Sequence, residues 1–176
     1  DIIILLDGST SVFPSNFELG KSWIKNLLQS FSSDIDKHNV VVGLYSFSNI
    51  IKREIPLSAR TYSTLSGMID AVRYPYGQTF IHTAINEAVQ EYQRAGRASV
   101  PKLLIVITDG EATVPSAVAP SANAARTRAA GIILTAVGIG SSVNENELTT
   151  IAGAAERVFR VSDFSSLGSI LAPLQK

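Results

Sequence analysis

Five consecutive apolar residues, 2–6, follow Asp1 and lead directly into Asp7 and Gly8. An uninterrupted apolar run of this length is typical of a strand that is buried on both faces, as in a parallel sheet. A second run of the same kind, residues 103–107, leads into Asp109 and Gly110. Two such strands need helices on both faces of their sheet, so this pair of runs constrains the fold more than any other feature.

Strand and helix patterns alternate along the rest of the chain. Apolar residues at helical spacing predict helices, and short apolar or alternating runs predict strands. The predicted strands cover residues 2–6, 40–47, 50–57, 102–108, 132–138 and 157–161. The predicted helices cover residues 16–31, 61–72, 81–94, 122–130, 145–154 and 164–175, and a polar loop is predicted over residues 111–120.

This order predicts an α/β fold: a doubly wound, mostly parallel six-stranded sheet with one antiparallel edge strand and helices on both faces, as in Rossmann-like proteins. The short turn at Ser48 makes residues 50–57 the antiparallel edge, which Lys52, Arg53 and Glu54 protect from pairing with other chains. Residues 1–176 are predicted to be a single domain. Because the chain begins directly on a core strand, we expect it to be excised from a larger multidomain protein.

The composition argues against several classes of function. Lys plus Arg and Asp plus Glu number 15 each, and no basic stripe is visible along the sequence, so a nucleic-acid partner is not expected. The chain has no cysteine, which excludes disulfides, zinc–thiolate sites and thiol nucleophiles. No apolar run is long enough to cross a membrane, so direct membrane insertion is not expected either.

Hard oxygen donors follow the first strand. Asp7, Ser9 and Ser11 stand at alternate positions, and such donors suit Mg²⁺, Mn²⁺ or Ca²⁺ rather than zinc. Ligands of doubly wound sheets bind beyond the carboxyl ends of the strands, where the strand order reverses. Asp109, which follows the second buried strand, should therefore lie nearby, and Thr79, at the end of a loop and just before a helix, is the natural third contributor.

These segments resemble a known family, the von Willebrand factor type A (vWA) domain, also called the inserted domain of integrins. Its metal-ion-dependent adhesion site (MIDAS) is formed by Asp-x-Ser-x-Ser, a Thr from a later loop and an Asp that closes a core strand. The resemblance covers essentially the whole chain, and residues 102–113 are particularly similar to the integrin version. It implies that a divalent cation, Mg²⁺ or Mn²⁺ first and Ca²⁺ as a possibility, is ligated by Asp7, Ser9, Ser11, Thr79 and Asp109.

The resemblance also implies a function. In the family, a Glu or Asp of the partner completes the coordination of the cation, so the chain is expected to bind an extracellular protein: collagen, another matrix protein or a cell-surface receptor. It would be secreted or part of the ectodomain of a membrane protein. A two-state switch that shifts the helix at 164–175 is implied as well. The family often has a second Thr where this chain has Ile81, a departure that concerns the affinity for the cation more than the existence of the site.

Three residues near the predicted cation, Tyr76, His82 and Glu111, are candidates for a rim that contacts the partner. Each has an alternative: Tyr76 packs under the loop, His82 is a residue of the first turn of a helix, and Glu111 is a solvated loop acid. A second function remains open: a structural matrix building block that assembles through surface contacts, with a non-essential metal site. An enzyme is not expected. A phosphatase built on an aspartate nucleophile needs a second acid where Ser9 stands, and neither histidine clearly supplies a base.

Overall fold

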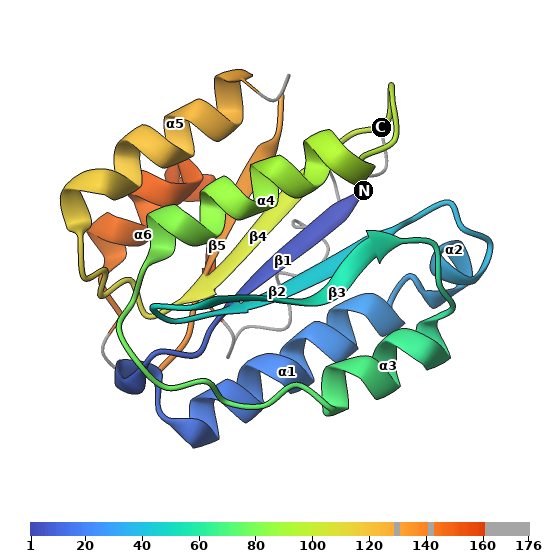
Figure 1. Ribbon diagram of the computed structural model, residues 1–176, viewed down its shortest axis with the longest axis horizontal. Helices are drawn as coiled ribbons and strands as arrows, with labels where there is room; N and C mark the ends of the chain where they lie inside the picture. Colours follow the sequence, from blue (N-terminus) through green and yellow to red (C-terminus); the bar gives the residue numbers. More distant parts are fainter. Residues whose placement is uncertain (129–130, 141–142, 161–176) are drawn as a thin grey trace.

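The computed structural model describes residues 1–128, 131–140 and 143–160, which form a six-stranded sheet between two layers of helices (Figure 1). The strands are β1 (Ile2–Asp7), β2 (Val42–Phe47), β3 (Ile51–Ser58), β4 (Leu103–Thr108), β5 (Ile133–Gly138) and β6 (Val158–Arg160). Their order is β3-β2-β1-β4-β5-β6, and every neighbouring pair is parallel except β2 and β3. The predicted sheet with one antiparallel edge strand is thereby confirmed.

Helices cover both faces of the sheet. One layer contains α1 (Pro14–Gln29), α2 (Ser32–Asp36) and α3 (Tyr62–Asp70), and the other contains α4 (Ile81–Ala95), α5 (Val118–Arg128) and α6 (Glu145–Ala152). The central strand shows why the apolar run is continuous. Ile2, Ile4 and Leu6 pack toward the α1 layer, whereas Ile3 and Leu5 pack toward the α4 layer. All five are fully buried, as expected for a strand covered on both faces.

The strand order reverses between β1 and β4. The chain leaves β1 toward β2 through α1 on one face of the sheet and leaves β4 toward β5 through α5 on the other face (Figure 1). The two strands pair in parallel, with Leu6 opposite Ile107, so their carboxyl ends lie side by side. This is the crevice in which doubly wound sheets bind ligands.

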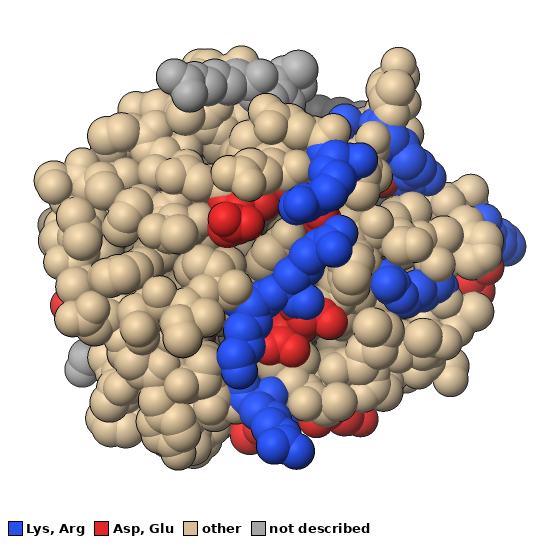
Figure 2. Space-filling view, viewed as in Figure 1, with Lys and Arg blue, Asp and Glu red and all other residues tan. Residues whose placement is uncertain are grey.

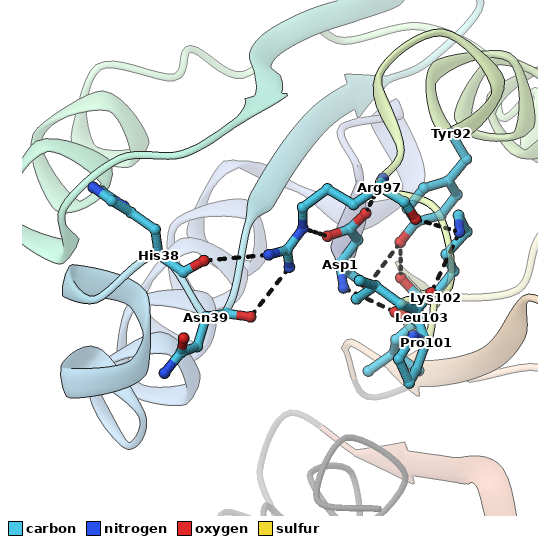
Figure 3. A network of polar contacts seen from close by, with 9 residues as sticks. Asp1, His38, Asn39, Tyr92, Arg97, Pro101, Lys102 and Leu103 are labelled. Atoms are coloured by element: carbon cyan, nitrogen blue, oxygen red, sulfur yellow. Dashed lines mark hydrogen bonds and ion pairs between the residues drawn. The ribbon is translucent and has the colours of Figure 1, made fainter.

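A polar network fixes the opposite, amino edge of the sheet (Figure 3). The buried carboxylate of Asp1 accepts hydrogen bonds from Nε of Arg97 (2.7 Å) and from its backbone N–H (2.8 Å). The remaining guanidinium nitrogens of Arg97 donate to the carbonyls of His38 (3.2 Å) and Asn39 (3.1 Å), and the Tyr92 hydroxyl donates to the Asp1 carbonyl (3.1 Å). These contacts tie α4, β1 and the segment before β2 together, away from the carboxyl ends of the strands.

Some predicted boundaries were wrong. The five-residue helix α2 was not predicted, and α1 begins at Pro14 rather than at residue 16. Helix α5 begins at Val118, so Pro120 lies in its first turn instead of in the predicted loop. Proline is tolerated there because the first N–H groups of a helix have no partner within the helix. The helix predicted at 164–175, and the shift implied for it, lie outside the described residues.

None of the helices described here is long and apolar enough to cross a membrane.

Candidate metal centre

Asp7 ends β1 and is fully buried at the carboxyl edge of the sheet. Its Oδ1 accepts the backbone N–H of Ser9 (2.8 Å), and its Oδ2 accepts the hydroxyl of Thr108, the last residue of β4 (2.6 Å). The pKa of this carboxyl is raised to about 7, chiefly by burial and also by the negative charge of Asp109, whereas the hydrogen bonds from Thr108 and Ser9 oppose the rise. Asp7 is therefore a buried carboxyl group whose negative charge the surrounding hydrogen bonds stabilise only in part.

Asp109 follows β4 directly and is connected to the same cluster. The Ser11 hydroxyl donates to its Oδ2 (2.6 Å), and the Oγ atoms of Ser9 and Ser11 lie 3.2 Å apart. Oδ1 of Asp109 accepts the backbone N–H of Glu111 (3.0 Å), which fixes the plane of the carboxylate. Four of the five predicted ligands thus form one cluster of oxygen atoms at the ends of β1 and β4.

Thr79 lies on a separate loop that is joined to both neighbours. On one side, Thr10 donates its backbone N–H to the Gly77 carbonyl (2.9 Å), and its Oγ1 accepts the Gly77 N–H (3.1 Å). On the other side, Thr79 donates its N–H to Thr113 Oγ1 and accepts the Thr113 N–H, both at 2.9 Å. The loop therefore sits between the Ser9–Ser11 segment and the segment after Asp109. No direct hydrogen bond joins Thr79 to the other four candidates in the described chain.

Two residues outside the predicted ligand set support the cluster, and the sequence reasoning missed the first of them, Thr108. Thr108 donates to Asp7 and also accepts the Gly110 N–H (3.1 Å), so one hydroxyl links the ends of both strands. Tyr74 donates its hydroxyl to the Ser9 carbonyl (2.6 Å). A hydroxyl at the last position of an otherwise apolar buried strand needs a polar partner, and that signal could have identified Thr108.

Exposed apolar side chains surround this edge. Five large hydrophobic side chains are exposed in the described part of the chain, and four of them lie on the loops beyond the carboxyl ends of the strands: Phe13, Ile50, Tyr76 and Val114. Phe13 (φ 71°) and Tyr76 (φ 60°) also have positive φ angles, which bulky residues adopt only where the surrounding structure imposes them. Strained, exposed aromatic residues beside a polar cluster are typical of a binding surface.

The three predicted rim residues differ in their surroundings. Tyr76 and Glu111 are exposed. His82 is half-buried, its ring centroid lies 5.9 Å from that of Phe80, and its Nδ1 is buried without a hydrogen-bond partner among the described residues. Glu147, which the sequence reasoning did not single out, lies close enough to Glu111 that burial first and the Glu111 charge second raise its pKa. The rim therefore carries two neighbouring acids, Glu111 and Glu147.

The donors fit a small, hard cation. The described residues place no Lys, Arg or His in an ion pair with Asp7 or Asp109. Nor do they contain a group of three or more His, Cys, Asp or Glu side chains that could hold a metal ion, since this cluster has only two acids. Two carboxylates and the hydroxyls of Ser9, Ser11 and Thr79 offer the oxygen ligands that Mg²⁺ and Mn²⁺ prefer, and they neutralise such a cation only in part.

Comparison with known sequences agrees with this geometry. The sequence model of the von Willebrand factor type A domain matches residues 1–173. The chain belongs to this family. Among relatives of this vWA domain are the collagen alpha-6(VI) chain of Homo sapiens (33% identical, 97% of this chain and 7% of the relative), matrilin-1 of Gallus gallus (31%, 99% and 35%) and integrin alpha-D of Homo sapiens (31%, 100% and 16%). The chain thus spans about a third or less of the length of each of these relatives.

Solved structures show the same fold. Proximal thread matrix protein 1 from the mussel byssus is 27% identical over 99% of this chain and 46% of its own, with a TM-score of 0.81. A manganese-loaded TRAP protein of Plasmodium vivax superimposes with a TM-score of 0.85 at 22% identity, over 99% of this chain and 72% of its own. These two structures show the fold, and the matrix and adhesion proteins among the relatives are the collagen, matrilin and integrin chains named above.

Proposed function

We propose that this vWA domain binds an acidic side chain of an extracellular protein through a divalent cation, Mg²⁺ or Mn²⁺ in preference to Ca²⁺. The cation would be held by Asp7, Ser9, Ser11, Thr79 and Asp109. One observation carries the proposal: two carboxylates at neighbouring strand ends, one fully buried and one nearly so, share a hydroxyl network and have no protein cation beside them in the described chain.

The composition of the cluster favours binding over catalysis. Three neutral hydroxyls and two carboxylates leave a divalent cation electrophilic, so an external carboxylate gains by completing its coordination. Hydrolysis would need a positioned base beside the metal. His82 is the nearest histidine in sequence, and its Nδ1 is buried rather than directed to solvent. The matrix and adhesion relatives support the same choice.

The rim narrows the chemistry of the partner. Phe13 and Tyr76 are each exposed by about three-fifths, and Ile50 and Val114 extend the apolar surface. We infer that the acidic residue of the partner is flanked by apolar residues, which bury this surface. Collagen, another matrix protein and a cell-surface receptor all remain candidates, and the site of action would be extracellular.

Metal binding is tested first, with Mn²⁺ as the spectroscopic probe and Mg²⁺ as the competitor. The cations reported for other proteins of this fold motivate this choice: the TRAP structure is manganese-loaded, and the mussel byssus protein is described with a zinc-occupied MIDAS motif. Asp109→Ala should abolish binding, and Asp34→Asn, an exposed acid of α2, should leave it unchanged. Equal Mn²⁺ affinity in both variants would contradict the assignment.

Adhesion is tested on immobilised matrix proteins in Mg²⁺ and then in chelator. The proposal expects capture that chelator reverses and that Asp109→Ala removes while the circular-dichroism spectrum is unchanged. Undiminished adhesion in chelator would refute the metal-bridged mode.

A second function is favoured by the identity of the relatives, which include collagen chains, a matrilin and a thread matrix protein. In that case the domain is a structural building block that assembles through surface contacts, with a non-essential metal site. Sedimentation of the domain across a concentration series separates the two functions, because assembly that persists in chelator and in Asp109→Ala belongs to the structural role.

A further inference from the structure

A band of basic side chains crosses one side of the molecule. Figure 2 looks onto the β3 edge of the sheet, with α4 above it, and shows Lys and Arg side chains in a nearly continuous row that crosses α4 and β3 and continues below them toward α1 and α3. The whole chain has 15 basic and 15 acidic residues, so the band does not follow from an overall excess of charge. The prediction that the chain has no basic stripe holds for the linear sequence, but the fold creates one from separate segments.

Two arginines of this side are held together by one buried acid. Glu91 on α4 has a side chain with 0% exposure, and it accepts hydrogen bonds from Nε and Nη2 of Arg53 on β3 (2.8 and 2.9 Å). It also accepts Nε of Arg94 (3.0 Å) and the backbone N–H of Leu57 (2.9 Å). Burial raises the pKa of Glu91, but the hydrogen bonds outweigh it and keep that pKa below its usual value. Glu91 is therefore charged and fixes both guanidinium groups on β3 and α4.

The pair presents unused donors to solvent. A guanidinium has five N–H groups. Arg53 directs two of them to Glu91 and Arg94 directs one, and the side chains remain 42% and 54% exposed. Two positive charges face one negative charge, so the cluster keeps a net positive charge. Lys52, the neighbour of Arg53 on β3, is exposed and forms no ion pair within the described residues, and it extends the row across the sheet edge.

A buried hydroxyl adjoins the same cluster. Tyr45 pairs with Arg53 across β2 and β3, and its hydroxyl is buried without a hydrogen-bond partner among the described residues. Burial raises the pKa of Tyr45, and the negative charge of Glu91 is the next contribution, which places the phenol close to the carboxylate. The buried phenol therefore packs beside the Arg53–Glu91 pair and contributes to the fixed position of these side chains.

We propose that Lys52, Arg53 and Arg94 form a second binding site, which takes the sulfate groups of a linear sulfated polysaccharide. Guanidinium groups with fixed orientation pair with the oxygens of sulfate or phosphate in a bidentate way. The cations form a row on an open edge, a shape that fits an extended polyanion better than a small anion.

A nucleic acid fits this surface less well. Proteins that bind single strands combine basic side chains with aromatic residues on which bases stack. The large aromatic side chains that are clearly exposed in the described chain, Phe13 and Tyr76, lie beside the metal centre and not on the β3 edge. The site shares no residue with that centre, so it works with or without a divalent cation.

The experiment measures binding of a defined heparin oligosaccharide by calorimetry in chelator, at several salt concentrations. Lys52→Gln and Arg94→Gln are the test variants, because neither leaves Glu91 without Arg53. Lys25→Gln is the matched control: this lysine on α1, in the other helix layer, pairs with Asp70 (2.8 Å). Each test variant should weaken binding about three- to tenfold and lower the slope of log affinity against log salt by about one, as for other polyanions.

The control should bind as the wild type does, and the double variant Lys52→Gln/Arg94→Gln should lose most of the affinity. Equal loss in Lys25→Gln, or unchanged affinity in the double variant, would overturn the site. Equally tight binding of a DNA single strand of matched charge, or of anionic phospholipid vesicles, would overturn the assignment to a sulfated polysaccharide. Because every measurement is made in chelator, these results do not depend on the metal-bridged function.

Discussion

Removing the charge of Asp7 should change how stability depends on pH. In the absence of a cation, burial raises the pKa of Asp7 from 3.8 to about 7. The folded protein therefore binds this proton more tightly than the unfolded chain does. Below about pH 4 the carboxyl is protonated in both states and has no effect. As the pH rises to about 7, only the unfolded chain releases the proton, so the folded state loses stability progressively.

The magnitude follows from the difference in pKa. About three pKa units at roughly 1.4 kcal/mol each give a loss of about 4 kcal/mol above pH 7, of which about 3 kcal/mol appears between about pH 5 and pH 8. Asn at position 7 does not titrate. It keeps an oxygen to accept the Ser9 N–H, and its NH₂ can donate to the Thr108 hydroxyl in place of the present bond.

Urea denaturation in chelator at about pH 5 and about pH 8 measures the difference, with m-values compared to check two-state behaviour. Asp7→Asn should gain about 3 kcal/mol relative to wild type between the two pH values. Adding Mg²⁺ at about pH 8 should restore the wild type and leave the variant unchanged. A difference between the two proteins that stays constant with pH would refute the reasoning, because the pKa of Asp7 would then not be raised by folding.

Three further substitutions test the supporting structure. Glu91→Gln should lower the free energy of unfolding by about 3 kcal/mol, because it breaks a buried ion pair, whereas Glu87→Gln on the same helix should change it little; equal urea midpoints for the two would contradict this. Gly8→Ala places a Cβ 2.2 Å from Pro75 Cδ and should cost about 1–3 kcal/mol, while Gly67→Ala in α3 meets nothing within 4 Å and should be neutral or stabilising. Thr108→Val removes the hydroxyl that fixes Asp7 and should weaken Mn²⁺ binding about tenfold with the fold intact; unchanged affinity would show that Thr108 does not orient this carboxylate.

The sheet was predictable because a strand that is buried on both faces has an uninterrupted run of apolar residues in the sequence. The apolar runs at 2–6 and 103–107 correspond to β1 and β4, and their register places Leu6 opposite Ile107. Once two strands are known to be parallel and buried, the residues that follow them must share one edge. The proximity of Asp7 and Asp109 at this edge therefore follows from the sheet topology, without any knowledge of side-chain contacts.

Boundaries were less predictable because the usual signals are incomplete. Helix α1 begins after Phe13, whose side chain provides no cap and whose φ angle is positive, so Pro14 at the first helical position signals its start without an N-cap residue before it. The five residues of α2 are too few to show a helical period. Pro120 reads as a loop residue, although the first turn of a helix accepts it.

Contacts between side chains of different elements produce no periodic pattern in the sequence. For this reason the basic row was not expected. Arg53 and Glu91 stand 38 positions apart, and Arg53 was interpreted only as a charge that protects an edge strand. They meet because β3 turns back antiparallel to β2 and α4 then packs against the same edge. The buried carboxylate of Glu91 is stabilised by the guanidinium groups of Arg53 and Arg94 together with the Leu57 N–H, so its burial and the convergence of the two arginines go together. Their half-exposed guanidinium groups are then a consequence of stabilising α4 on the sheet, and their N–H groups that do not contact Glu91 face solvent, where an anion can replace water as the acceptor.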